Sequence, residues 1–399
     1  MPPISESSAH PSNSQLTVSA LHSSLMPTVL VALHLEFKKR RWRTGGRIGV
    51  SGPGDTLRLV HALRRLRQRE AWPRVVVVTT DIHRLAGLFS GTPPLLQGES
   101  GARVATDGAF ELVEMPPGAH YADETGRIND SLLEAALEKV NLPWRDASPR
   151  LAHAFIGAGS NGSLTVQGRT FVRMRIDWSD VMNGDVFGAA HVDLDKRVVA
   201  VPVRKGVASF SDMDSPSWLV EAVRNVARRH GLSILWYGLK HDRDFHEIGA
   251  DESALAYGDL SYAAQLAELR TRAGCAVGFN SGGLDLAGAA GLPLLRVAEY
   301  QAGGFLLEPI LKKEKRRQWG RSYNAFLASC THVGLGPAKA RSEAFPRDVF
   351  DASLDAFLKL FLGGHLHLRR HVVLPFGVPL REANANELLA IHATRGVMK

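Results

Sequence analysis

Two glycine-rich turns, each between an apolar run and a helical pattern, hold the residues best suited to chemistry. The first is Gly52-Pro53-Gly54-Asp55, which follows the apolar residues 47–50. Gly52 and Gly54 permit a tight turn, and ligands of open α/β sheets bind outside the carboxyl ends of the strands. We therefore expect Asp55 at the rim of a cleft. The alternative is that Asp55 only caps its helix and interacts with the helix dipole.

The second turn is Asn280-Ser281-Gly282-Gly283, with Asp285 in the helix that follows. A helix N-terminus presents free N–H groups and a partial positive charge, so phosphate oxygens are its natural ligands. The Asn280 amide and the Ser281 hydroxyl add further donors. The small residues at 287–291 would let this helix pack close to a sheet. The alternative is a tight turn with no ligand.

Cations and a further glycine follow two other predicted strands. Arg204 and Lys205 come directly after the apolar run 198–203, where they could neutralise a departing diphosphate; the alternative is a solvated loop pair. Gly238, after the run 233–237, opens a loop that could form the wall of a nucleotide base or ribose site.

Other candidate sites are weaker, and we predict no metal site. Asp193 and Asp195 have the spacing of a metal-binding acidic pair but directly precede a strand, which indicates a surface turn. His365 and His367 lack a supporting acidic or cysteine pattern and are interpreted as exposed loop residues. The sequence has neither a phosphate-binding loop with Lys-Ser/Thr nor a Gly-x-Ser-x-Gly elbow.

Strands and helices alternate along most of the chain, which predicts parallel sheets with right-handed crossovers. Strands are expected at 47–50, 75–79, 110–113, 198–203, 233–237, 276–279, 294–297 and 371–376, and helices at 55–70, 130–140, 217–230, 262–273, 284–290 and 348–362. The valine run at 75–78 is typical of a strand buried on both faces. The fold class is therefore α/β, with two doubly wound Rossmann-like domains.

A length of 399 residues also indicates two domains. We expect a disordered extension at 1–24, an N-terminal Rossmann-like domain at 25–190 and a C-terminal Rossmann-like domain at 191–345. The helix and tail at 346–399 could pack back on the N-terminal domain. The glycine-rich stretch 157–188, with only short β-like runs, is the expected place of the interdomain connection.

Composition indicates a cytoplasmic protein. Cys275 and Cys330 are the only cysteines and lie in apolar contexts, which predicts buried thiols and excludes a disulfide framework. The apolar run 25–37 is too short to span a bilayer, and its basic cluster follows it, unlike a signal peptide.

The net charge is +8, which favours anionic partners. The basic residues of the chain are dispersed and lack the interleaved aromatic residues of a nucleic-acid module, so we expect no nucleic-acid partner. The cluster at 38–43 could contact the inner face of a membrane if the acceptor is lipid-linked.

Two blocks together resemble the heptosyltransferases of lipopolysaccharide assembly and their GT-B glycosyltransferase relatives. The first is Arg47-Ile48-Gly49-Val50 followed by Gly54-Asp55 and a helix ending at 62–66; the second runs from 259–261 through the turn at 278–287 to 293. The resemblance implies two Rossmann-like domains facing a central cleft, with Asp55 as the catalytic base. It also implies that the second block contacts the donor sugar and diphosphate, so that 25–190 is the acceptor domain and 191–345 the sugar-nucleotide domain. The family usually has Asp at the position of Asn280 and often His at that of Asp285.

The expected reaction is inverting, metal-independent transfer of a sugar from a nucleotide-diphosphate sugar to a glycan, lipid-linked or other hydroxyl acceptor. The nucleotide sugar is a co-substrate, and no cofactor is expected. Two alternatives stay open: a non-catalytic sugar-nucleotide or glycan-binding module, and a sugar-nucleotide epimerase with the same architecture.

Overall fold

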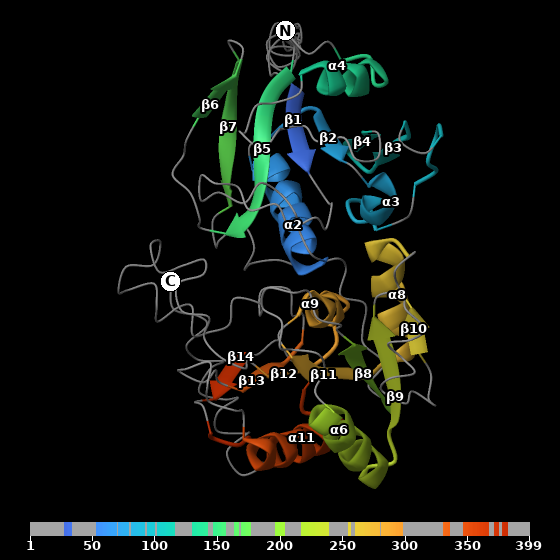
Figure 1. The fold of residues 1–399 in the computed structure, drawn as a ribbon, viewed down its shortest axis with the longest axis vertical. Helices are drawn as coiled ribbons and strands as arrows, with labels where there is room; N and C mark the ends of the chain where they lie inside the picture. Colours follow the sequence, from blue (N-terminus) through green and yellow to red (C-terminus); the bar gives the residue numbers. More distant parts are fainter. Residues whose placement is uncertain are drawn as a thin grey trace, which may run out of the picture.

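The computed structural model describes most of two β-sheets and the helices around them. The residues described are 28–33, 53–69, 71–79, 81–91, 94–99, 102–115, 130–142, 147–156, 163–166, 169–176, 196–203, 217–238, 254–256, 260–279, 281–297, 330–335, 346–366, 371–374 and 377–381. Each sheet has seven strands, and the architecture is mixed α/β (Figure 1).

The first sheet is mainly parallel, and its first strand in sequence lies at its centre. Its strands, in the order β3-β4-β2-β1-β5-β7-β6, are β1 (Thr28–Leu33), β2 (Val75–Thr79), β3 (Val104–Asp107), β4 (Phe110–Glu114), β5 (Ala147–Ile156), β6 (Ser163–Val166) and β7 (Arg169–Ile176). The five inner strands are parallel, and the edge strands β3 and β6 are antiparallel to their neighbours. Leu112 and the valines of β2 are almost wholly buried, as a sheet covered on both faces requires.

All seven strands of the second sheet are parallel. In the order β10-β9-β8-β11-β12-β13-β14 they are β8 (Val198–Val203), β9 (Ser233–Gly238), β10 (Ala254–Ala256), β11 (Cys275–Phe279), β12 (Leu294–Val297), β13 (His332–Leu335) and β14 (His371–Leu374). The chain first adds strands on one side of β8 and then, from β11 onward, on the other. The strand order therefore reverses between β8 and β11.

Helices cover both faces of the second sheet. The helices of the described chain are α2 (Pro53–Arg69), α3 (Ile82–Leu85), α4 (Asp130–Glu138), α6 (Ser217–Arg229), α8 (Tyr262–Arg272), α9 (Gly282–Ala289) and α11 (Arg347–Leu362). Alternate strand residues separate the two faces: Val199 and Val277 pack with α6 and α11, whereas Ala200 and Ala276 pack with α8 and α9. This is the layering expected from helical crossovers between parallel strands.

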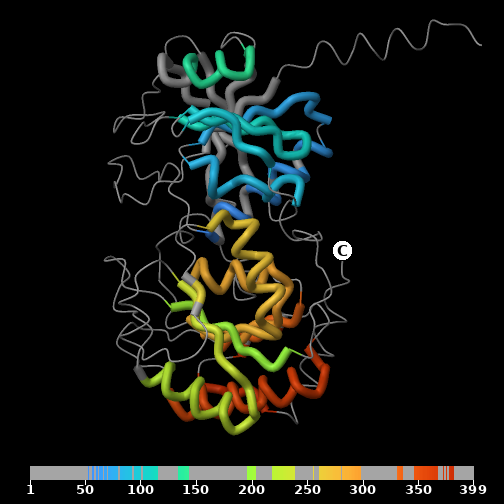
Figure 2. The backbone as a smooth tube through the Cα atoms, turned by 90° about the vertical axis from the view of Figure 1, so that its right-hand side faces the viewer, coloured from blue at the N-terminus to red at the C-terminus, as the bar shows by residue number. Residues whose placement is uncertain are grey.

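The two sheets are joined through their helices. Helix α2 lies against α9 near the middle of Figure 1, and α3 lies against α8 to the right of them; Figure 2 shows the blue and yellow segments meeting at mid-height. One apolar cluster runs through this contact, because it contains Leu57 and Val60 of α2 together with Leu284 and Leu286 of α9. In Figure 1, the arrowhead of β1 points toward the second sheet and that of β9 toward the first sheet. The carboxyl ends of these two strands therefore lie on the sides of the sheets that face each other.

Most expected elements are confirmed within one or two residues at each end. The strands β3, β5, β10 and β13 and the short helix α3 were not expected, and three further features differ. The central strand β1 comes from residues 28–33, an apolar run for which we expected no strand, while the expected strand 47–50 lies outside the described residues. Strands β6 and β7 lie inside the stretch 157–188 that we expected to connect two domains. Finally, α11 packs on α6, and β14 pairs with β13, so these parts of the tail belong to the second sheet.

Candidate functional site

The candidate site lies at the carboxyl edge of the second sheet, where the strand order reverses. In open α/β sheets, the connections leaving two such neighbouring strands go to opposite faces, which leaves a crevice outside the strand ends. Here the two strands are β8, which ends at Val203, and β11, which ends at Phe279. Both are followed at once by residues singled out in the sequence, Arg204 and Asn280, which lie outside the described residues.

Helix α9 begins beside this reversal point. Ser281 is its N-cap, with an extended backbone and a hydroxyl that accepts a 3.3 Å hydrogen bond from the Leu284 N–H. This bond satisfies one of the N–H groups that a helix start leaves open. Gly282 and Gly283 follow, and α9 lies against β8, β11 and β12. Small residues allow this close approach, and Ala287 and Ala289 are wholly buried.

The neighbouring strand β9 supports the same helix start. The hydroxyl of Tyr237, a wholly buried side chain, donates a 2.8 Å hydrogen bond to the carbonyl oxygen of Gly283. Gly238, the last residue of β9, faces Val203 so closely that a Cβ would lie 2.7 Å from the Val203 carbonyl oxygen. Gly238 therefore allows the ends of β8 and β9 to lie close together at this edge.

A buried charged network lies beneath the first turn of α9. Asp285 and Arg296 are each 3% exposed, and the Arg296 Nη2 atom donates to Asp285 Oδ1 at 2.8 Å. The Arg296 Nε atom donates to Nε2 of His332, 3.0 Å away and wholly buried. Because Nε2 accepts this bond, the imidazole is neutral and carries its proton on Nδ1. Arg296 thus bridges α9, β12 and β13.

The predicted donor-site residues divide into three groups. Ser281, Gly282, Gly283 and Gly238 come together at one edge of the sheet, as expected from their positions after parallel strands. Asp285 belongs to the same helix turn, but its carboxylate faces inward to Arg296. The remaining donor residues, Arg204, Lys205 and Asn280, lie outside the described residues, as does the loop glycine Gly52.

Asp55 and Gly54 lie inside α2. The helix begins at Pro53, two residues before its expected start, so Asp55 is its third residue and does not occupy the capping position. Proline is well suited to a first helical position, because its missing N–H would have no partner there. A carboxylate in a first turn still interacts favourably with the helix dipole.

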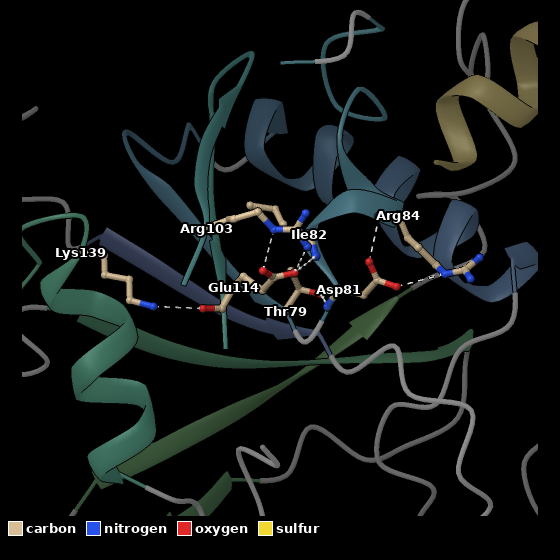
Figure 3. Close-up of polar contacts among 7 residues, drawn as sticks. All are labelled: Thr79, Asp81, Ile82, Arg84, Arg103, Glu114 and Lys139. Atoms are coloured by element: carbon tan, nitrogen blue, oxygen red, sulfur yellow. Dashed lines mark hydrogen bonds and ion pairs between the residues drawn. The ribbon is translucent and has the colours of Figure 1, made fainter. Parts of the chain in front are cut away.

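Polar side chains also gather at the carboxyl edge of the first sheet (Figure 3). Glu114, the last residue of β4, has a side chain only 4% exposed and receives two hydrogen bonds from Arg103, at 2.7 and 2.8 Å. The Ile82 N–H donates to the same carboxylate at 3.2 Å. The hydrogen bond with Glu114 raises the pKa of Arg103 above its ordinary value. The forked pair joins the two strands of the edge hairpin, and the bond from Ile82 ties that hairpin to the start of α3.

The start of α3 contacts the second half of the chain. Asp81 caps α3, accepting from the Arg84 N–H at 3.2 Å, and its carboxylate pairs with Arg84 Nε at 3.1 Å. The Arg84 guanidinium lies 5.8 Å from the ring centre of Tyr262, the first residue of α8. Burial raises the pKa of the Tyr262 hydroxyl, an effect that its hydrogen bonds with Thr56 and Arg84 oppose. Tyr262 therefore joins α8 to both α2 and α3.

Sequence alone does not identify the residues that hold the helix starts and strand ends of the site in place. Tyr237, Glu114 and Tyr262 resemble ordinary core or surface residues in sequence. Arg296 does carry a detectable signal, because an arginine inside the apolar run Leu294–Val297 must find a buried partner. Its partner could not be identified from sequence, since His332 comes from a strand 36 positions later.

The described residues hold neither a metal cluster nor a membrane-spanning helix. Within them, no three histidine, cysteine, aspartate or glutamate side chains are grouped so as to hold a metal ion. No helix among them is both long enough and apolar enough to cross a membrane.

Comparison with known proteins gives structural likeness only. No family model and no curated protein matches the chain. Among solved structures, a glycosyl transferase family 9 protein from Veillonella parvula DSM 2008 is 11% identical with a TM-score of 0.40, over 68% of this chain and 81% of that one. E. coli heptosyltransferase WaaC with ADP is 12% identical with a TM-score of 0.36, over 70% and 89%. Likeness at this level leaves function to be argued from the site.

Proposed function

We propose that this protein is a glycosyltransferase that moves a sugar from a nucleotide-diphosphate sugar to a hydroxyl acceptor. One observation carries the proposal: the strand order of an all-parallel sheet reverses between β8 and β11, and the capped Gly-Gly start of α9 stands at that point. Crevices of this kind take nucleotides, because the helix start offers N–H groups and a partial positive charge to phosphate. The sequence resemblance to heptosyltransferases adds the transfer of a sugar.

The donor diphosphate would lie on Ser281, Gly282 and Gly283, with Arg204 and Lys205 reaching it from the end of β8. The region after Gly238 would hold the base or ribose. Negative charge develops on the leaving diphosphate during transfer, so cations and N–H groups placed there favour the transition state over the ground state.

The acceptor would bind on the opposite side, at the carboxyl edge of the first sheet. Asp55 would take the proton of the acceptor hydroxyl as its oxygen attacks the anomeric carbon, and the bond from that carbon to the diphosphate oxygen would break. Attack opposite the leaving group inverts the anomeric centre and needs no metal. The contact between α2 and α9 supports this assignment, because it joins the helix that carries Asp55 to the helix that would hold the donor.

This assignment makes the first sheet the acceptor domain and the second sheet the sugar-nucleotide domain. The two would close over the donor, so that water does not hydrolyse it. A lipid-linked acceptor would place the protein at the inner face of a membrane, with the basic cluster at 38–43 on the lipid.

Two helix-capping serines provide a matched test of the donor site. Ser281 caps α9, and Ser261 caps α8 with the same bond, from the Ala264 N–H at 3.1 Å. Alanine at either position should cost about 1 kcal/mol of stability. We expect ADP, UDP or GDP, or one of their sugars, to raise the Tm of the wild type and of Ser261→Ala, but not of Ser281→Ala. Equal binding by all three proteins would contradict the proposed site.

The inward-facing carboxylate of Asp285 favours a second candidate, a non-catalytic sugar-nucleotide module. Both functions predict nucleotide binding, so turnover must separate them. We expect the wild type to release nucleoside diphosphate when an acceptor is present, and Asp55→Asn to bind the nucleotide sugar without turnover. Binding without turnover in the wild type, against a broad acceptor panel, would favour the module. Conversion of the donor without any acceptor would favour an epimerase.

A further inference from the structure

The first turn of α9 is held by side chains from both sides of the strand-order reversal. Tyr237 of β9 binds the Gly283 carbonyl oxygen at 2.8 Å, and Arg296 of β12 binds the Asp285 carboxylate at 2.8 Å. The strands β9 and β12 flank the central pair β8 and β11. The turn is thus fixed to the sheet at two points, and both supporting side chains are buried.

Asp285 introduces an electrostatic conflict. A carboxylate in the first turn stabilises the helix, but it also opposes any anion that binds the same N-terminus. The carboxylate here is turned inward onto the Arg296 guanidinium, in surroundings where charges are weakly screened. The pair of Asp285 and Arg296 carries no net charge. His332 adds none, because it accepts from Arg296 as a neutral imidazole.

We propose that Arg296 is a charge-compensating and positioning residue of the diphosphate site, an inference that rests on the proposed function. Arg296 cancels the negative charge of Asp285, which leaves the positive end of α9 available to phosphate. Together with Tyr237 it also holds the turn of Ser281, Gly282 and Gly283 in place. Arg296 acts on the ligand through α9 and does not touch it.

A structural pair and a compensating pair predict different effects of substitution. If the pair only stabilises the fold, Asp285→Asn lowers stability and leaves affinity for an anion unchanged or weaker. If Arg296 compensates Asp285, Asp285→Asn leaves an excess positive charge near the site and tightens anion binding. Asparagine keeps a side-chain oxygen that can accept the Arg296 hydrogen bond, so this variant changes mainly charge.

The test compares four proteins, the wild type, Asp285→Asn, Tyr237→Phe and the double variant Asp285→Asn/Arg296→Met, by calorimetric titration with ADP, UDP, GDP and inorganic pyrophosphate. We expect Asp285→Asn to bind the preferred diphosphate about tenfold more tightly at low salt, with a gain that shrinks as salt rises. The double variant carries no charge at either position but, like Tyr237→Phe, lacks one support of the turn, so it should bind within about threefold of Tyr237→Phe. Tyr237→Phe removes a support but no charge, so it should weaken binding without changing the salt dependence.

The outcomes separate the two proposals. Binding by the wild type, with no tightening in a folded Asp285→Asn protein, would overturn the role of Arg296 and leave the proposed function standing. If neither the wild type nor any variant binds a diphosphate, the proposed function and this inference both fail. The double variant avoids an unpaired buried charge, so it tests the inference even if Asp285→Asn does not fold: affinity more than tenfold below that of Tyr237→Phe would refute charge compensation.

Discussion

Single buried carboxylates organise the polar loops at the strand ends. Asp107, the last residue of β3, is wholly buried and accepts hydrogen bonds from three backbone N–H groups, those of Gly87 at 2.9 Å, Phe89 at 3.1 Å and Ser90 at 2.8 Å. It thereby fixes the turn that follows α3. Three backbone donors served by one side chain make that side chain hard to replace.

Asp107→Ala should therefore lower the free energy of unfolding by about 3 kcal/mol, because three N–H groups lose their acceptor. Urea denaturation followed by circular dichroism measures the effect. The exposed neighbour Thr106 is the control, and Thr106→Ala should change stability by less than about 0.5 kcal/mol. Equal losses in the two variants would show that the bonds to Asp107 do not matter.

The Cys330 thiol predicts a loss of stability at alkaline pH. Burial raises its pKa from 9.0 to about 11, so the folded protein keeps a proton that the unfolded chain releases. This contribution is fully present below pH 9 and is lost as the pH rises toward 11. Between about pH 8 and pH 10.5, the wild type should lose about 2 kcal/mol more than Cys330→Ser. Parallel stability curves for the two proteins would contradict the shift.

Residue types at strand ends could be predicted from sequence better than their contacts. The turn at Ser281, Gly282 and Gly283 is identifiable because paired glycines between an apolar run and a helical pattern are typical of a tight strand-to-helix connection. The direction of the Asp285 side chain is not, because it depends on Arg296, which belongs to a different element, strand β12. Contacts between distant segments leave no local pattern, so that part of the site needed the structure.

At the scale of the elements, close packing between a helix and a strand depends on glycine. Gly274 lies between α8 and β11, and a Cβ there would meet the carbonyl oxygen of Lys196 and lie 2.6 Å from Cζ of Phe361. Gly364, just after α11, has open space around it but a φ of +73°. The two glycines are therefore required for different reasons, one for space and one for backbone conformation.

Alanine should be tolerated differently at these two positions. We expect Gly274→Ala to cost about 3 kcal/mol, because backbone and core must both move. Gly364→Ala should cost about 1 kcal/mol, since only the left-handed backbone is strained. Denaturation midpoints in urea measure both, and a smaller loss at Gly274 than at Gly364 would show that this packing is looser than described.

The longer helices and seven of the fourteen described strands could be predicted, for a physical reason. Strands such as Val198–Val203 and Leu294–Val297 are short apolar runs bounded by turns, and helices such as Ser217–Arg229 repeat their apolar residues at helical spacing. Strand β1 could not be predicted, because an apolar run followed by a basic cluster is ambiguous. In the expected connection, β6 (SLTV) is too short for a clear pattern, whereas β7 alternates apolar and polar residues over 172–176, which is a strand signal.

For the molecule as a whole, the contact between the two sheets is a property of the chain that solution measurements can test. Tyr262 is almost wholly buried and forms hydrogen bonds with Thr56 of α2 and Arg84 of α3. These bonds cross from one half of the chain to the other, beside the apolar contact of α2 and α9. Substitutions on the two sides should therefore be energetically coupled.

A double-mutant cycle of Thr56→Ala and Tyr262→Phe should give a coupling energy of about 0.5–1 kcal/mol, since each change removes the same hydrogen bond. Thr271 provides a control, because its exposed hydroxyl bonds to carbonyls of its own helix, at 3.0 and 3.1 Å. Thr56→Ala combined with Thr271→Ala should be additive. Additivity in both cycles would mean that Thr56 and Tyr262 do not meet in solution.

The position of β1 has a consequence for the synthesis of the protein on the ribosome. Val29 pairs with Val75 of β2 on one side and with Ser148 of β5 on the other. The central strand of the first sheet therefore lacks its second neighbour until β5 has emerged. At ordinary translation speeds this delay is on the order of ten seconds. During it, the apolar segment TVLVAL has one side open to other chains and to chaperones. The demand for protection during synthesis therefore falls on the first sheet, before any residue of the second has been made.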